Sequence, residues 1–177
     1  IVSERQQDIY YQKITNLCKK MREFHNWIKS ILIYKYCSPI KEFNKKNSVR
    51  TTVLDIGCGR GGDLLKIYHA RVGEYVGTDI DYYGIFSSTD GAVSRYNQFK
   101  KKYPDFGKAE WIQVTATLPL ESEVQESRFP NMTKENKDLI TKTFKNNKFD
   151  CLISMMALHY LFDSKDSVLN FIDNIKK

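Results

Sequence analysis

The stretch Val53-Leu54-Asp55-Ile56-Gly57-Cys58-Gly59-Arg60-Gly61-Gly62-Asp63 decides the fold of this chain. It begins as an apolar strand and continues into a turn that contains four glycines. Glycine is favoured where the backbone adopts a positive φ or lies against a ligand. The backbone N–H groups at the start of a following helix then face that ligand. The stretch is therefore typical of a nucleoside-cofactor site in an α/β sheet.

The spacing of these glycines fits two cofactors. Gly57-x-Gly59-x-x-Gly62 matches the dinucleotide fingerprint, whereas Gly57-x-Gly59-x-Gly61 matches the pattern of S-adenosylmethionine sites. Asp55 favours S-adenosylmethionine, because a carboxylate beside the turn attracts an ammonium group and repels a pyrophosphate. A tight turn without a ligand remains as a third interpretation, although such a turn needs fewer glycines.

From residue 51 onward, predicted strands alternate with predicted helices. Apolar runs predict strands at residues 51–56, 74–79, 109–115 and 149–155, and amphipathic or capped segments predict helices at 63–70, 91–103, 133–145 and 164–177. Residues 116–132 contain two prolines and predict an irregular segment. Asp79 ends the second strand, where a carboxylate accepts ribose hydroxyls in either kind of cofactor site. Crossover helices between strands indicate an α/β fold with a doubly wound, mainly parallel sheet.

A helical pattern precedes this core. Apolar residues recur at alternating spacings of four and three, and Ser3 with Gln6 predicts a capping box; the apolar positions are Tyr10, Ile14, Leu17, Met21, Phe24, Ile28 and Ile31. The spacing also fits a coiled coil, but polar residues interrupt the seam and favour a helix that packs on the domain. We therefore divide the chain into an N-terminal helical segment with a linker, residues 1–50, and a cofactor-binding core, residues 51–177.

Charge and cysteine content restrict the partners and the compartment. The net charge is +7 at pH 7 with clustered lysines, which fits a polyanionic partner and equally fits a solvated basic surface. The four cysteines form no CxxC pair, so we expect no metal site and a reducing, cytoplasmic compartment. The apolar run at residues 151–162 is too short to span a bilayer, so we expect no membrane partner.

The last predicted strand adds two expectations. Its continuation, Ser154-Met155-Met156-Ala157-Leu158-His159-Tyr160, lacks the [Asp/Asn]-Pro-Pro-aromatic motif of amino-group methyltransferases and the Pro-Cys of cytosine-C5 methyltransferases. Its continuous apolar character is typical of a strand that is buried on both faces. In a four-strand sheet this strand would be an exposed edge, so we expect that the C-terminal part of the fold continues beyond Lys177, or that another chain covers the edge.

Three segments carry more specific motifs. They are Phe24-His25-Asn26-Trp27-Ile28-Lys29-Ser30, the glycine stretch at residues 54–66, and Leu158-His159-Tyr160-Leu161-Phe162. Together they resemble the mRNA cap (guanine-N7) methyltransferase family, whose corresponding motifs are F-N-N-W-x-K-S, L-D-x-G-C-G-K-G-G-D-L-x-K and F-x-x-H-Y-x-F. The insert at residues 116–147 and the lysine- and asparagine-rich composition resemble multifunctional capping enzymes of large cytoplasmic DNA viruses such as African swine fever virus.

The resemblance implies a Rossmann-like class I methyltransferase that uses S-adenosylmethionine, acts on the capped 5′ end of RNA, and shares a longer chain with other capping domains. The implied cofactor-binding residues are Lys29, Asp55, Gly57, Gly59, Asp63, Asp79 and Met155. The implied cap-binding residues are His25, Asn26, Arg60, His159 and Tyr160. His159 and Tyr160 would position the guanine, and Arg60 would contact the cap phosphates.

The chain also departs from the family pattern. His25 stands where Asn is usual, Arg60 where Lys is usual, and Met155 where Gln is usual. Thr115-Ala116-Thr117 occupy the place of the acid that holds the adenine amine. The differences bear on how tightly each ligand is held, because Arg and Lys contact phosphates with different geometry.

Guanine N7 carries a free lone pair, so its methylation needs no acid or base, and we expect catalysis by in-line placement. Two alternatives remain. A ribose 2′-O-methyltransferase would need a lysine as the base, for which Lys29 is the candidate. A non-catalytic stimulatory or scaffold domain would have lost cofactor binding, which the retained Asp55, Gly57, Gly59 and Asp79 argue against. A dehydrogenase is disfavoured by Asp55 and by the His-Tyr pair.

Overall fold

The computed structural model describes residues 19–39, 50–146 and 148–176 of the 177-residue chain. The predicted capping box at Ser3 and Gln6, and the apolar positions Tyr10, Ile14 and Leu17, lie outside the described residues. So does most of the predicted linker, residues 40–49. Within the described residues, no helix has the combination of length and apolar character that a bilayer span requires.

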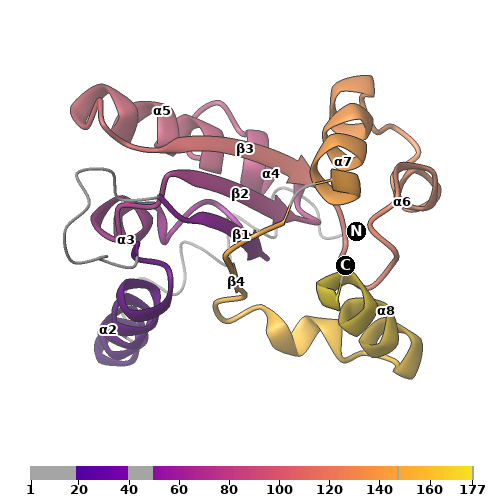
Figure 1. The fold of residues 1–177 in the computed structure, drawn as a ribbon, viewed down its shortest axis with the longest axis horizontal. Helices are drawn as coiled ribbons and strands as arrows, with labels where there is room; N and C mark the ends of the chain where they lie inside the picture. The colour runs from indigo at the N-terminus through magenta and orange to yellow at the C-terminus, as the bar shows by residue number, and fades with distance from the viewer. Residues whose placement is uncertain (1–18, 40–49, 147, 177) are drawn as a thin grey trace.

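A four-stranded parallel sheet forms the centre of the molecule, with helices on both sides (Figure 1). Its strands are β1 (Thr52–Ile56), β2 (Glu74–Asp79), β3 (Lys108–Gln113) and β4 (Cys151–Ile153), in the order β3-β2-β1-β4. Every neighbouring pair is parallel, and Asp55 in β1 lies between Gly77 and Ile153 in the register. The predicted α/β fold with a parallel sheet is confirmed.

Helices cover both faces, as a doubly wound sheet requires. They are α2 (Lys19–Tyr36), α3 (Leu64–His69), α4 (Tyr82–Phe86), α5 (Ala92–Lys102), α6 (Ser122–Arg128), α7 (Lys134–Asn146), α8 (Lys165–Lys176) and the 3₁₀ helix η1 (Leu158–Leu161). Val53 and Trp111 point into one apolar cluster, which includes residues of α2, α3, α4 and α5. Leu54 and Ile112 point into a second, which includes residues of α7, α8 and η1. Successive strand residues thus alternate between two cores.

The helix α2 confirms the predicted helical segment but corrects its buried face. Met21, Phe24 and Ile31 of the predicted stripe are 52%, 56% and 44% exposed. The buried residues at this end are Ile33 and Cys37, which join the cluster that contains α3. The periodicity of the segment indicates the helix, but the contact with α3 decides which side of it is covered.

Two helices occur where the sequence did not predict them. The segment at residues 116–132 is predicted to be irregular, yet it contains α6. Gln125 of α6 is fully buried and bonds both backbone groups of Thr115, its Oε1 accepting from N and its Nε2 donating to O, at 2.9 Å each. This side chain satisfies backbone groups that would otherwise be buried without partners. The second unpredicted helix, α4, is only five residues long.

The strand β4 is shorter than its sequence predicts. The apolar run at residues 149–155 predicts a strand that is buried on both faces, but β4 contains only Cys151–Ile153, and Leu152 is 37% exposed. Among the described strands β4 pairs with β1 alone, so it lies at the edge of the sheet. This exposure agrees with the expectation that the strand is an edge when the sheet has four strands.

Candidate functional site

The glycine turn after β1 forms a compact loop at the carboxyl end of the sheet. Gly57, Gly59 and Gly61 have φ angles of +83°, +52° and +69°. The N–H groups of Gly57 and Cys58 both donate to the carbonyl of Thr78 in β2, at 2.8 and 3.0 Å. All three φ values lie in the left-handed region that glycine adopts most readily, so the predicted role of the glycines in shaping the turn is supported by the backbone itself.

Gly57 and Gly59 are glycines for different reasons. A Cβ atom on Gly57 would lie 2.3 Å from Cβ of Ala157, which follows β4. A Cβ atom on Gly59 would meet nothing within 4 Å. Close packing therefore requires glycine at 57, while Gly59 faces the open space that a cofactor needs. Sequence reasoning missed Ala157, because the contact joins two loops that are far apart along the chain.

Asp79 fixes the turn from the end of β2. Its Oδ2 accepts a hydrogen bond from the N–H of Gly59 at 2.7 Å, and its Oδ1 accepts one from the N–H of Asp81 at 2.9 Å. Burial raises the pKa of Asp79, and the backbone donors oppose that rise. An ionised carboxylate has about four acceptor sites, so Asp79 retains acceptor capacity for further hydroxyl groups.

Helix α2 brings a lysine to the helix that follows the turn. Lys29 Nζ lies 2.9 Å from Oδ2 of Asp63, and Lys66 Nζ lies 2.9 Å from its Oδ1. Lys66 also donates to Oδ1 of Asn26 at 3.2 Å. The side chains of Lys29, Asp63 and Lys66 are 18%, 11% and 14% exposed. The fold thus brings Asn26 and Lys29 of α2 together with Asp63, which directly precedes α3. All three were predicted as site residues.

Asp55 is buried beneath the turn and only half of its carboxylate is satisfied. Its Oδ2 accepts from Tyr75 Oη at 2.7 Å, while its Oδ1 is buried with no hydrogen-bond partner among the described residues. Burial raises the pKa of Asp55 to about 7, and the hydrogen bond from Tyr75 opposes the rise. An orphaned buried acceptor is uncommon in folded proteins and marks a place where a donor from a ligand would be stabilised.

Arg60 is paired within the protein. Its Nη1 forms an ion pair with Oδ2 of Asp90, and the Arg60 side chain is 12% exposed. Ser87 Oγ donates to the other oxygen of Asp90 at 3.0 Å, and Arg95 Nε donates to the Asp90 carbonyl at 3.2 Å. Sequence reasoning missed Asp90, which follows α4, the helix it also missed. The predicted contact of Arg60 with cap phosphates stays a prediction, and it now requires sharing this guanidinium with Asp90.

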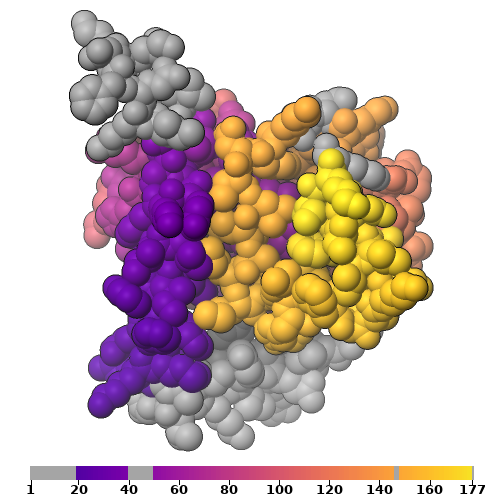
Figure 2. All heavy atoms as spheres, turned by 60° about the horizontal axis from the view of Figure 1, so that its bottom comes forward, coloured from indigo at the N-terminus to yellow at the C-terminus, as the bar shows by residue number. Residues whose placement is uncertain are grey.

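The segment after β4 carries the predicted guanine-binding pair. Met156 adopts a positive φ of +65°, and η1 then presents His159 and Tyr160, whose ring centroids are 3.9 Å apart. Both side chains are exposed. Figure 2 shows this segment at the surface between α2 and α8. Met155 is partly buried and packs against the core cluster, and His25 on α2 lies beside Phe24.

Residues 115–117, where the resemblance implies an adenine-binding acid, contain two threonine hydroxyl groups instead. Thr115 Oγ1 and Thr117 Oγ1 lie 2.7 Å apart, shortly after β3. Thr115 is buried and Thr117 is partly buried. These hydroxyls bond each other, so they supply a polar but uncharged surface at this end of β3.

Comparison with known protein families matches residues 2–177 to the mRNA (guanine-N(7))-methyltransferase domain. This chain belongs to that family. It is 40% identical over 166 residues, 94% of its length, to a probable mRNA-capping enzyme of Acanthamoeba polyphaga mimivirus. It is 28% and 32% identical, over 89% and 81% of its length, to mRNA cap guanine-N(7) methyltransferases of Schizosaccharomyces pombe and Drosophila melanogaster.

The match covers only part of each relative. The chain spans 13% of the length of the mimivirus protein, 35% of the fission yeast protein and 30% of the Drosophila protein. The predicted family is therefore confirmed, together with the Rossmann-like methyltransferase fold class that it implies. Membership of a methyltransferase family also implies a methyl donor.

Proposed function

We propose that this chain transfers a methyl group from S-adenosylmethionine to guanine N7 of the 5′ cap of mRNA. One observation carries the proposal most directly. Gly57, at the base of the cofactor turn, packs against Ala157, and Ala157 directly precedes η1 with the predicted guanine-binding pair. A methyl donor held by the turn and a purine held by η1 would then be neighbours, which is what direct transfer between them requires.

The residues of the turn fit S-adenosylmethionine. The orphaned Oδ1 of Asp55 lies beneath the turn and matches a cationic ammonium donor, and the open space at Gly59 leaves room for a ligand against the backbone. Asp79 retains acceptor capacity for ribose hydroxyls. Lys29, held at Asp63, would attract the methionine carboxylate. When bound, the cofactor supplies an electrophilic methyl group on a sulfonium.

The chain's own residues would act by positioning and electrostatics. His159 and Tyr160 would hold the guanine ring, with Asn26 and His25 on the facing helix and Arg60 near the cap phosphates. No side chain needs to move a proton, because N7 already offers a lone pair. Positive charge passes to the purine ring during transfer, so carboxylates and aromatic faces beside the ring stabilise the transition state more than the neutral guanine.

The proposal includes a capping context. The similarity to a mimivirus protein named as a probable mRNA-capping enzyme supports a capped RNA 5′ end as the partner. The chain spans a small part of that protein, which supports further capping domains on a longer polypeptide. A cytoplasmic viral setting agrees with the same similarity and stays a prediction.

The experiment that tests the proposal identifies the methylated atom. The full-length protein is incubated with G-capped RNA and radiolabelled S-adenosylmethionine, and the RNA is digested to nucleosides and chromatographed. We expect label in 7-methylguanosine. Label in a 2′-O-methylnucleoside would instead support the alternative in which Lys29 acts as a base, although its pairing with Asp63 at 2.9 Å favours a fixed cationic role.

Calorimetric titration separates the enzyme from a scaffold. We expect S-adenosylmethionine to bind the full-length protein, and Gly59→Val to abolish binding by filling the open space at the turn. A wild-type protein that folds but binds no cofactor and methylates no RNA would contradict the proposal and favour a non-catalytic domain. His159→Ala with wild-type methylation of capped RNA would overturn the guanine-holding role of that residue.

A further inference from the structure

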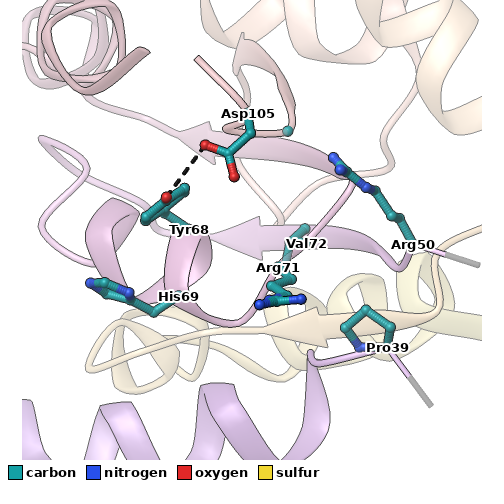
Figure 3. A pocket seen from close by; sticks show the side chains of 8 residues that line it. Pro39, Arg50, Tyr68, His69, Arg71, Val72 and Asp105 are labelled. Atoms are coloured by element: carbon teal, nitrogen blue, oxygen red, sulfur yellow. Dashed lines mark hydrogen bonds between the residues drawn. The ribbon is translucent and has the colours of Figure 1, made fainter. Parts of the chain in front are cut away.

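A pocket of about 400 Å³ lies at the amino ends of the strands, opposite the glycine turn (Figure 3). Its walls come from the residues before β1, the turn between α3 and β2, and the residues before β3, which contribute Arg50, Arg71 and Asp105 respectively. Strands rise about 3.3 Å per residue, so the six residues of β2 separate the pocket from the predicted cofactor site by roughly 20 Å. The pocket therefore has no part in methyl transfer itself.

Positive charge is in excess at this end of the sheet. Arg50 and Arg71 are exposed and come from separate segments, and an adjoining hollow shares Arg50 and adds Lys108. The carboxylates in the two linings are Asp105 and Glu74. Neither arginine side chain hydrogen-bonds or ion-pairs with another side chain of the described residues. Guanidinium groups bind phosphate oxygens through paired N–H donors, so the lining favours a phosphate-bearing ligand.

The backbone of Arg71 has a conformation that favours glycine over arginine. Arg71 adopts a φ of +59° directly after the end of α3. Its N–H bonds the carbonyl of Tyr68 at 2.9 Å, and the N–H of Val72 bonds that of Ile67 at 3.4 Å. These two bonds define a Schellman motif, in which glycine is the usual residue at the left-handed position. A non-glycine residue there costs roughly 1 kcal/mol, and glycine would be more stable at this position.

Gly73 lets the other arginine lie against the pocket. A Cβ atom on Gly73 would lie 2.3 Å from Cβ of Arg50 and 3.1 Å from its Cδ. The stem of Arg50 therefore lies directly across the backbone of Gly73. The position of Arg50 is set by this contact, as that of Arg71 is set by the end of α3.

Aromatic rings stand beside the arginines. Tyr68 stacks on Tyr103 with ring centroids 4.4 Å apart, and His69 lies 5.2 Å from Tyr68. Tyr68 Oη donates a hydrogen bond to Oδ1 of Asp105 at 3.3 Å, as Figure 3 shows. The carboxylate of the pocket lining thus already accepts one hydrogen bond from the protein. Figure 3 also shows Arg71 between His69 and Pro39. Arginines next to aromatic faces are the usual means of binding single-stranded nucleic acid, whereas free phosphate needs no aromatic surface.

We propose that this pocket binds the body of single-stranded RNA, with Arg50 and Arg71 contacting phosphodiesters and the exposed His69 stacking on a base. The proposal rests on the proposed function only in its choice of RNA as the polyanion. A strand stacked as in a duplex advances about 3.4 Å per nucleotide, so RNA in that conformation would span the roughly 20 Å between the two sites with about six nucleotides. The pocket would thus distinguish long transcripts from short cap analogues.

Fluorescence anisotropy with a labelled, uncapped 20-nucleotide RNA tests the proposal without any methyl transfer. The full-length protein is titrated at several salt concentrations, as wild type and as Arg71→Gly. We expect the variant to bind at least about threefold more weakly, and the slope of log affinity against log salt to fall by about 0.7, the value for one phosphate contact on single-stranded nucleic acid. We expect its melting temperature to match or exceed that of the wild type, because glycine suits the Schellman motif.

Matched variants distinguish a local contact of Arg71 from a general loss of positive charge. Arg128→Ala, at the exposed end of α6, deletes one positive charge elsewhere and should leave affinity and slope unchanged. Arg71→Lys should restore the salt slope but only part of the affinity, because lysine lacks the paired donors. Unchanged RNA affinity in Arg71→Gly would overturn the proposal. Competition with RNA by inorganic phosphate or by a poly-glutamate peptide, at the same charge concentration, would also overturn it. Competition by phosphate would indicate a general anion site, and competition by the peptide would indicate an acidic protein as the ligand.

Methylation assays keep this proposal distinct from the proposed function. If the wild-type protein methylates neither a capped dinucleotide nor capped RNA but loses RNA affinity on Arg71→Gly, the proposed function fails and the RNA pocket stands. If it methylates both substrates and Arg71→Gly raises KM for long capped RNA at unchanged kcat, both stand. If it methylates both and Arg71→Gly alters neither RNA affinity nor that KM, the pocket proposal alone fails.

Discussion

At both ends of the sheet a residue adopts the left-handed backbone conformation, but the residues differ: glycines at the carboxyl end and an arginine at the amino end. At the carboxyl end, Gly57 and Gly59 adopt positive φ angles of +83° and +52°, and carboxylates such as Asp79 surround the turn. At the amino end, Arg71 adopts a φ of +59°, and its guanidinium lines a pocket with Arg50. Where glycine is required by close packing, the chain has glycine. At the exposed position 71, it has a charged side chain.

The contrast in charge matches the contrast in proposed ligands. S-adenosylmethionine carries positive charge at its sulfonium and ammonium groups, which carboxylates attract, whereas RNA carries one negative charge per nucleotide. The proposed site for the cationic cofactor and the proposed site for the RNA body would thus lie at opposite ends of one sheet. Four substitutions test this division, beginning with the largest expected effect.

Gly57→Ala should damage the carboxyl end most. The new Cβ would lie 2.3 Å from Cβ of Ala157 while φ stays at +83°, and overpacking together with a left-handed residue lowers the free energy of unfolding by about 3 kcal/mol. Thermal or urea unfolding measures the loss. Gly62→Ala is the matched control, since its Cβ would meet nothing within 4 Å, and a loss as large as that of Gly57→Ala would contradict the packing argument.

Lys29→Met should weaken cofactor binding with little effect on folding. The substitution keeps the apolar stem but removes the cation that is 2.9 Å from Asp63. We expect the Kd for S-adenosylmethionine to rise about tenfold, or roughly 1.4 kcal/mol, by calorimetric titration. Lys19→Met removes a charge from the exposed start of the same helix, and equal effects of the two variants would refute a specific role for Lys29.

Asp55→Asn should alter the pH dependence of stability. Burial raises the pKa of Asp55 from 3.8 to about 7, so the native state binds a proton between about pH 4 and 7 that the unfolded chain has already released. The free energy of unfolding therefore falls as pH rises through this window, and the loss persists above it. The asparagine variant should lack this fall, which urea unfolding at pH 5 and pH 8 measures.

The affinity for S-adenosylmethionine should depend on the ionisation of the Asp55 carboxyl group. An ammonium bound to Asp55 favours the ionised form, so the affinity for S-adenosylmethionine should increase as pH rises toward 7 and then level off. The matched control is Asp163→Asn, an exposed residue beyond η1, which should retain both pH dependences. An Asp55→Asn variant with the wild-type pH profiles would show that Asp55 is not the group responsible.

Gly73→Ala should have the smallest functional effect and should act at the amino end. Its Cβ would displace Arg50 from its place across the backbone, where the contact is 2.3 Å. We expect RNA affinity in the anisotropy assay to fall about twofold, the smallest functional effect of the four. The free energy of unfolding should fall by about 1–3 kcal/mol, because the two Cβ atoms separate only if the backbone shifts. Cofactor binding should stay unchanged, and a change there would mean that the two ends of the sheet do not act separately.

Local patterns predict the fold more reliably than they predict contacts between distant segments. The second strand is predicted with the observed ends, because its apolar residues lie next to each other in sequence. The contact of Ala157 with Gly57 and the pairing of Arg60 with Asp90 could not be found this way, because each joins separate loops. Lys29 is identified as a site residue only through family resemblance, since a lysine beside an apolar stripe is usually solvated.

The amino-end pocket illustrates a different limit. Arg50, Arg71 and Asp105 occupy ordinary positions in the sequence, and no spacing rule joins them. The Schellman motif is encoded by the end of α3, but an arginine at its left-handed position leaves no sequence signal because glycine is the residue that marks such ends. Only the assembled sheet brings these three residues to one place.

The contact between Ala157 and Gly57 also has a thermodynamic consequence. Gly57 belongs to the turn that would hold the methyl donor, and Ala157 leads into the segment that would hold the cap. The Cβ of Ala157 occupies the place of a side chain on residue 57, so the two loops are in direct contact. If binding of one ligand stabilises this arrangement and so raises the affinity for the second, the second must raise the affinity for the first by the same factor. Donor and acceptor would then bind cooperatively through a single methyl-sized contact.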